Sequence, residues 1–196
     1  MFISFEGIDG SGKSTQAKLL AEELGEDAAL VREPGGTAVS ERIRGLLADP
    51  ELPLQPFPEL LLFCAARAQL IQEVIHPALQ EGRTVICDRY ADSSVAYQGG
   101  GRGLGTDYVR QLCTATTGGI WPQLTLLLWV EPEVGLARAK GSDRFEAEGI
   151  EFQRRVAAAY REIAEQEPGR VRTVEADGSV SEVHEAVMSE LASARA

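Results

Sequence analysis

The sequence is short of positive charge. Its 196 residues include 19 lysines and arginines against 30 aspartates and glutamates, so the formal net charge at pH 7 is −11. A protein this acidic is a poor candidate for coating a nucleic-acid backbone or an anionic membrane. It can still bind a small phosphate ligand where its few cations converge on one cleft. We therefore expect neither nucleic acid nor a membrane as a partner.

Cysteines and long apolar runs are also scarce. The three cysteines, Cys64, Cys87 and Cys113, are odd in number, and no two have the spacing of metal ligands. Cys64 and Cys87 stand in apolar runs, which is typical of buried free thiols in a reducing compartment. No signal-peptide pattern opens the chain, and no apolar run approaches the ~20 residues of a membrane-spanning helix. We expect a cytoplasmic protein.

Short apolar runs alternate with longer stretches of helical periodicity. The expected strands are 2–6, 28–32, 84–87, 125–130 and 171–175. The expected helices are 13–24, 39–47, 56–80 with a bend near Pro77, 106–116, 133–140, 151–166 and 180–191, the last capped by Ser179 or Asp177. Apolar strands separated by helices indicate an α/β protein with a parallel sheet covered on both faces. The length favours one domain, 1–196, and the glycine-rich stretch 99–105 is expected to be a flexible loop.

Residues 7–14 read GIDGSGKS and fit the phosphate-loop pattern G-x-x-x-x-G-K-[ST] at every fixed position. An expected strand precedes the motif and an expected helix follows it. Glycines allow successive backbone amides to point inward and bind an anion at the start of the helix. Lys13 would contact the β- and γ-phosphates, and Ser14 would bind Mg²⁺. The nucleotide is expected to contact Gly7, Ile8, Asp9, Gly10, Ser11, Gly12, Lys13, Ser14 and Thr15.

The phosphate loop does not identify the acceptor by itself, but the loop and five further segments together do. Together they resemble thymidylate kinases, nearly over the full length and in the family's order, and the acidic loop matches the bacterial form. The segments are FEGIDGSGKST at 5–15, REPGGT at 32–37, LLFCAARAQ at 61–69, DRYADSSVAYQGGGRG at 88–103, WPQLTLLLWV at 121–130 and DRFEAEGIEFQRRVAAAY at 143–160. The resemblance implies a three-layer P-loop NTPase fold with a five-stranded parallel sheet. It also implies transfer of the γ-phosphoryl group of ATP to dTMP with Mg²⁺, in dTTP biosynthesis, by a homodimer with helix 56–76 as a candidate interface.

Arginines are the expected ligands of the acceptor phosphate, because a planar guanidinium binds phosphate in a bidentate way. The resemblance implies this role for Arg44 and Arg89. Arg89 directly follows an expected strand, and ligands of parallel sheets bind where strands end. Asp88 ends the same strand and is a candidate for the outer magnesium shell, through metal-bound water. Asp9 is expected to meet the sugar 3′-hydroxyl or the metal shell.

The resemblance also implies how the base is recognised. Phe63 and Arg67 are four residues apart and share a helix face. Phe63 would stack on thymine and Arg67 would donate to its O4, where cytosine presents an amino donor. Ser94 and Gln98 are expected at the N3 edge, and Tyr97 against the deoxyribose. Glu33, before Pro34 and a peptide bond that is often cis in the family, would organise the acceptor site.

Residues 139–149, AKGSDRFEAEG, are polar and contain two glycines, as suits a short lid that closes over the triphosphate. The phosphate loop has no arginine at its variable positions, and relatives of that kind carry the transition-state cation in the lid. Arg144 is the first candidate, and Arg138 and Lys140 are the others.

Two alternatives remain. The first is a kinase for another nucleoside monophosphate, against which the segment 88–103 argues. The second is a GTP-hydrolysing switch protein. Such proteins usually carry an N-K-x-D step after a strand, and this sequence has none.

Overall fold

The computed structural model describes residues 1–139 and 148–195. Five parallel strands form one sheet, as the sequence predicts, and the structure places them in the order β2-β3-β1-β4-β5. The strands are β1 Phe2–Glu6, β2 Ala28–Arg32, β3 Thr84–Asp88, β4 Leu124–Trp129 and β5 Val171–Glu175. Every residue of β1 is buried, because helices cover both faces of the sheet. This is why the central strands read as unbroken apolar runs.

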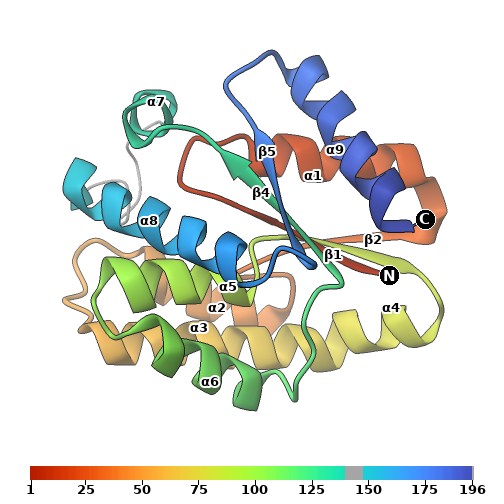
Figure 1. The fold of residues 1–196 in the computed structure, drawn as a ribbon. Helices are drawn as coiled ribbons and strands as arrows, with labels where there is room; N and C mark the ends of the chain where they lie inside the picture. Colours follow the sequence, from red (N-terminus) through yellow and green to blue (C-terminus); the bar gives the residue numbers. More distant parts are fainter. Residues whose placement is uncertain (140–147, 196) are drawn as a thin grey trace.

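Helices cover both faces of the sheet (Figure 1). On one face lie α1 (Lys13–Leu24) and α9 (Val180–Arg195), with the 3₁₀ turn Gly25–Asp27 after α1. On the other lie α3 (Pro56–Leu70), α5 (Ala91–Ser94), its π-helical continuation η3 (Val95–Gly101) and α8 (Ile150–Gln166). Outside them pack α2 (Ala38–Ala48) and α6 (Thr106–Thr116), while α7 (Pro132–Arg138) contacts α8.

The strand register brings three loops together at one edge of the sheet. Phe5 of β1 pairs with Asp88 of β3, and Arg32 of β2 pairs with the same Asp88. The phosphate loop after β1, Glu33 after β2 and Arg89 after β3 therefore leave the sheet at the same level. This is the edge at which parallel sheets bind ligands.

The expected helix 56–80 was predicted to bend near Pro77, and its hydrogen-bond pattern changes a little before that residue. Its α-helical part ends at Leu70, and Ile71–Ile75 form a π-helical turn, η2, before α4 (His76–Gln80). Pro77 has no N–H, and its ring would clash with the carbonyl of Glu73 in a regular helix, so the hydrogen-bond ladder shifts in the preceding turn.

The prediction of a flexible loop over 99–105 was wrong at its start. Gly99, Gly100 and Gly101 end the helical segment that begins at Ala91. A Cβ on Gly100 would lie 2.5 Å from Cβ of Ala159, and one on Gly101 would lie 2.7 Å from the Phe152 ring. Gly100 and Gly101 are required because η3 and α8 pack too closely for side chains at these two positions.

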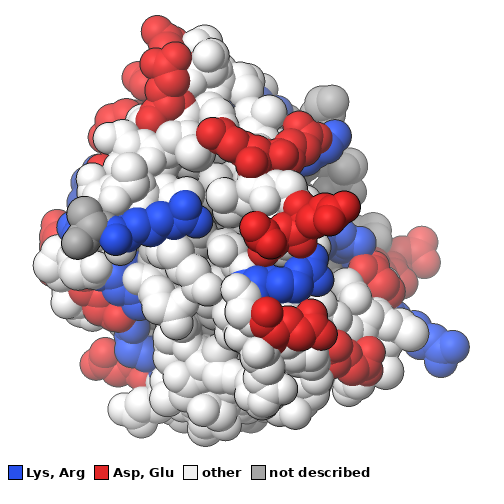
Figure 2. Space-filling model, turned by 90° about the vertical axis from the view of Figure 1, so that its right-hand side faces the viewer, with Lys and Arg blue, Asp and Glu red and all other residues white. Residues whose placement is uncertain are grey.

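Other boundaries agree within two residues, except that the last helix continues to Arg195. Ser179 caps that helix: its N–H donates to Glu182 Oε2 at 2.8 Å, and its Oγ accepts from the Glu182 N–H at 3.3 Å. None of the described helices is long and apolar enough to cross a membrane. On the face in Figure 2, lysines and arginines are interleaved with acidic side chains and form no continuous basic patch.

Gly100→Ala should destabilise the fold by roughly 1–3 kcal/mol, because the added methyl group overpacks the contact with Ala159. The matched control is Gly45→Ala, at an exposed position of α2 where a Cβ meets nothing within 4 Å. That change should stabilise by about 0.5–1 kcal/mol. Urea unfolding of both variants measures the difference. Equal free energies of unfolding would contradict the packing role of Gly100.

Candidate active site

The phosphate loop joins β1 to α1 in a conformation that requires glycine. Gly7, Gly10 and Gly12 have φ angles of 140°, 77° and 91°. A Cβ on Gly7 would lie 2.5 Å from the Leu128 carbonyl oxygen, and one on Gly10 would lie 2.1 Å from that of Gly135. The loop therefore rests on the end of β4 and on α7. Gly12 is the N-cap of α1, so the positive end of that helix faces the loop.

Lys13 and Ser14 carry the polar groups of the loop. The Lys13 ammonium is buried and donates to the Ile8 carbonyl at 2.7 Å and to Ser11 Oγ at 3.2 Å. Burial, together with the charge of Arg89, lowers the pKa of Lys13 to about 8. An anion in this loop would offset both effects.

The Ser14 hydroxyl donates to Asp88 Oδ2 at 2.5 Å, so the two predicted magnesium residues lie together. The described residues contain no group of three or more acidic, histidine or cysteine side chains that could hold a metal alone. Mg²⁺ at nucleotide sites usually takes one or two protein oxygens, with water and phosphate oxygens completing the shell. A hydroxyl beside a carboxylate fits that requirement.

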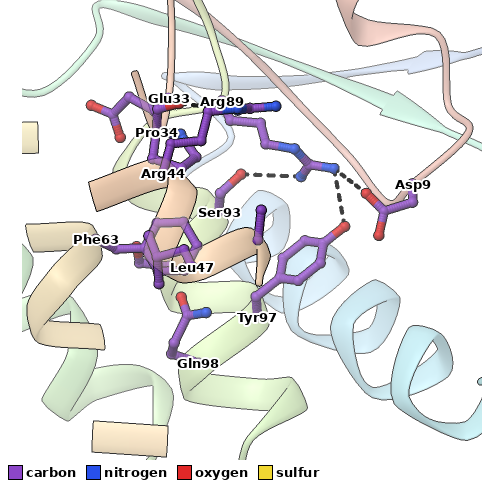
Figure 3. Close-up of a pocket in the computed structure, with 12 residues that line it drawn as sticks. Asp9, Glu33, Pro34, Arg44, Leu47, Phe63, Arg89, Ser93, Tyr97 and Gln98 are labelled. Atoms are coloured by element: carbon purple, nitrogen blue, oxygen red, sulfur yellow. Dashed lines mark hydrogen bonds and ion pairs between the residues drawn. The ribbon is translucent and has the colours of Figure 1, made fainter. Parts of the chain in front are cut away.

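Arg89 lies between the phosphate loop and a pocket next to it (Figure 3). It is the only non-glycine residue of the described chain with a positive φ, 67°, and its N–H donates to the Phe5 carbonyl at 3.0 Å. The guanidinium donates to the Gly7 carbonyl at 3.1 Å and the Tyr97 hydroxyl at 3.2 Å, and pairs with Asp9. A strained backbone held in this way is common at functional sites.

Asp9 is held from two sides. One carboxylate oxygen pairs with Arg89, and the other accepts a hydrogen bond from Gln153 Nε2 at 3.0 Å. Burial alone would raise the pKa of Asp9, but the charges of Arg89 and Lys13 outweigh it, so this pKa lies below its ordinary value. Asp9 is thus an ionised acceptor at the boundary between loop and pocket.

The pocket brings together all the predicted acceptor-site residues except Arg67. They come from α2, α3, α5, η3 and the loops after β1, β2 and β3, and Figure 3 shows their side chains converging. Its lining consists of Asp9, Glu33, Pro34, Arg44, Leu47, Ala48, Phe63, Arg89, Ser93, Ser94, Tyr97 and Gln98. An apolar part made by Phe63 and Leu47 faces a polar end with two arginines. A flat base attached to an anionic group fits that division.

Arg67 lies directly behind the pocket wall, with 1% of its side chain exposed. Its Nε donates to Glu33 Oε2 at 2.7 Å, and one Nη donates to Ser94 Oγ at 2.9 Å and to the Tyr90 carbonyl at 3.2 Å.

Burial raises the pKa of Glu33 to about 7 in spite of Arg67. Glu33 Oε1 is buried and has no hydrogen-bond partner in the described part of the chain. The bond between Glu33 and Pro34 is cis, as predicted.

The remaining predicted cations are placed differently. Arg44 on α2 donates to the Pro34 carbonyl at 3.0 Å and lines the pocket. Arg138 donates to the carbonyls of Ala176 and Asp177 at 2.8 and 3.1 Å, which ties α7 to the loop after β5. Lys140 and Arg144 lie outside the described residues, so the lid cation stays a prediction.

Several site residues were missed by the sequence analysis. Ser93 lines the pocket, donates to Glu6 Oε2 at 2.6 Å and lies 3.4 Å from an Arg89 Nη. It lies on α5, the short helix that directly follows Arg89, inside the segment 88–103 that carries the family resemblance, and that place could have revealed it. Gln153, by contrast, reaches Asp9 from a helix far along the chain. No local pattern marks that contact.

The chain is similar to known proteins over most of its length. The thymidylate kinase family model matches residues 5–187. A thymidylate kinase of Synechococcus sp. (strain JA-3-3Ab) is 50% identical over 93% of this chain and 91% of its own length. That of Deinococcus radiodurans is 46% identical over 90% and 88%. The crystal structure of the Ehrlichia chaffeensis thymidylate kinase matches with a TM-score of 0.81 at 36% identity, covering 97% of this chain and 98% of the other.

Sequence and structure thus lead to one family. With a family match over most of its length and relatives at up to 50% identity among those named above, the chain belongs to the thymidylate kinases.

Proposed function

We propose that this chain transfers the γ-phosphoryl group of ATP to dTMP, giving ADP and dTDP on the way to dTTP. One observation carries the proposal. Asp9 of the phosphate loop and Arg89, which pairs with Asp9, also line the acceptor pocket. A donor phosphate in the loop and an acceptor phosphate in the pocket would meet at this pair. The chain thus has two adjoining anion sites, which a GTP-hydrolysing switch would not require. Nothing favours another monophosphate as acceptor.

Phosphoryl transfer to a monophosphate needs positioned substrates and stabilised charge, and it needs no general base. A phosphate monoester has a second pKa of about 6, so the attacking oxygen is already anionic near neutral pH. Arg89 and Arg44 would hold that phosphate in line with the γ-phosphorus, while the loop amides and Lys13 stabilise charge on the transferred group. Asp9 would orient Arg89 and meet the 3′-hydroxyl of the sugar.

We propose that Phe63 stacks on thymine and that Arg67 presents its charge to the O4 edge from behind Ser94. Tyr97 would pack on the deoxyribose. Ser94 and Gln98 would face N3. Mg²⁺ would be held by Ser14 and, through water, by Asp88, and when bound it would neutralise phosphate charge.

A homodimer is the proposed assembly. Exposed apolar side chains gather on α2, α3 and α6: Val39, Leu46, Phe57, Leu61 and Tyr108 are each at least 41% exposed. The Phe57 and Tyr108 rings lie 6.3 Å apart, which links two of these helices. A second copy would cover this surface. The three buried free cysteines support a cytoplasmic location.

Lys13→Ala should lower kcat by ~10²-fold or more, because it removes a cation that stabilises the transferred phosphoryl group. Lys18→Ala is the matched control, since Lys18 lies on the same helix with 72% of its side chain exposed. A coupled ADP-release assay with dTMP measures both, and thermal unfolding checks the fold. Near-normal turnover of the Lys13 variant would reject the proposed role of the loop.

Arg144→Ala should lower kcat by roughly 10²- to 10³-fold and leave dTMP binding nearly unchanged, if Arg144 supplies charge only in the transition state. Arg138→Ala should have a smaller effect on kcat, because that guanidinium already bonds to two backbone carbonyls. Turnover and calorimetric dTMP binding of both variants test this. If Arg138→Ala lowers kcat more than Arg144→Ala does, the transition-state role belongs to Arg138. Normal turnover of both variants would exclude such a role for either arginine.

Glu33→Gln should make the protein's stability less dependent on pH. Burial raises the pKa of Glu33 from 4.5 to about 7, so its contribution to stability is full below pH 4.5 and is lost as pH rises through 7. Glu6 has a pKa of about 7 for the same reason, so the decline should shrink without vanishing. Urea unfolding from pH 5 to 8 measures it, with exposed Glu162→Gln as control. An unchanged slope would place the Glu33 pKa near its ordinary value.

A further inference from the structure

Glu59 is a buried carboxylate that does not line the pocket but bonds to a residue that does. It lies in the first turn of α3, and its side chain is 0% exposed. Its Oε1 accepts a hydrogen bond from Gln98 Nε2 at 2.9 Å. Gln98 lines the pocket, and in Figure 3 its amide lies beneath Phe63 and Leu47. Gln98 is therefore held between a carboxylate on one side and the acceptor pocket on the other.

Arg102 keeps this carboxylate in place. Its Nε and one Nη donate to the two oxygens of Glu59, each at 3.2 Å, and its guanidinium carbon lies 5.0 Å from the centre of the Phe152 ring. Its other Nη pairs with Glu148. An ion-paired carboxylate has only acceptors to offer a neighbour. The side of Gln98 that faces Glu59 must therefore be a donor.

A carboxamide has a donor end and an acceptor end, which exchange places when the group turns over. Turned over, Gln98 would place its carbonyl oxygen against Glu59 Oε1, and two acceptors would face each other with no hydrogen between them. Glu59 thus excludes one of the two orientations. In the orientation that remains, the NH₂ group of Gln98 donates to Glu59, and Gln98 Oε1 is the end that can bind a ligand.

We infer that Glu59, held by Arg102, is a positioning residue that fixes the Gln98 amide with its carbonyl oxygen toward the base. Resting on the function proposed above, this makes the pocket an acceptor for N3–H of thymine or uracil. Cytosine has an unprotonated N3, which would face Gln98 Oε1 as a second acceptor. Glu59 would thereby select the base without touching it.

Glu59→Gln tests the inference, because a glutamine can donate or accept and leaves Gln98 free to turn over. The measurement is kcat/KM for dTMP and dCMP at saturating ATP. We expect the dTMP-to-dCMP ratio to fall roughly 10-fold or more, mainly through a higher KM for dTMP, as for loss of one oriented hydrogen bond. The KM for ATP should not change. Exposed Glu162→Gln is the matched control and should keep the wild-type ratio.

A double-mutant cycle separates positioning from a general structural effect. In a Gln98→Ala background, Glu59→Gln should not lower the ratio further, since the group through which it acts is gone. An equal fall in that background would overturn the inference, as would an unchanged ratio in the single variant. If Glu59→Gln does not fold, Glu59→Asp keeps the charge beside Arg102 but withdraws it from Gln98, and an unchanged ratio there is also decisive. A wild-type protein inactive on dTMP would instead reject the proposed function.

Discussion

The ion pair between Arg89 and Asp9 is the interaction on which the site depends. Two anionic phosphates must meet, so a cation has to stand between them, and that cation must not drift toward either one. Arg89 is fixed at both ends: its backbone is held to β1 through Phe5, and its guanidinium is held to the phosphate loop through Asp9 and Gly7. Because β1 and β3 are paired in the sheet core, the register of two buried strands sets the position of one charge.

The other cations around the pocket follow the same rule. Arg67 is paired with Glu33 and Arg102 with Glu59, and each pair is largely withdrawn from water. Buried pairs of this kind contribute little net stability, because desolvation offsets most of the attraction. Their value here lies in orientation. A chain with a net charge of −11 can thus still offer a positively charged site, since two of its arginines, Arg44 and Arg89, line the same pocket.

Local sequence patterns predicted most of the fold. Contacts between segments that are distant in the sequence could not be predicted from such patterns. The strands and the phosphate loop depend on neighbours within a few residues, so period and spacing reveal them. Spacing placed Phe63 and Arg67 on one helix face, but it did not show that Arg67 lies behind the pocket wall and not in the lining. The helix through Gly101 was missed because glycine disfavours helices, and only α8, which is distant in the sequence, explains its presence. The contacts of Gln153 with Asp9 and of Glu59 with Arg102 likewise link separate elements.

The close packing of η3 on α8 has a mechanical consequence. Tyr97 and Gln98 lie on η3, and α8 begins at Ile150, just after residues 140–147. With backbone and small side chains in direct contact, the two helices have no soft layer between them to absorb a shift. A displacement of α8 would therefore be passed on to Tyr97 and Gln98, which line the pocket. Gln153 of α8 also bonds to Asp9, so the phosphate loop and the pocket share one rigid support, and strain in either would reach the other.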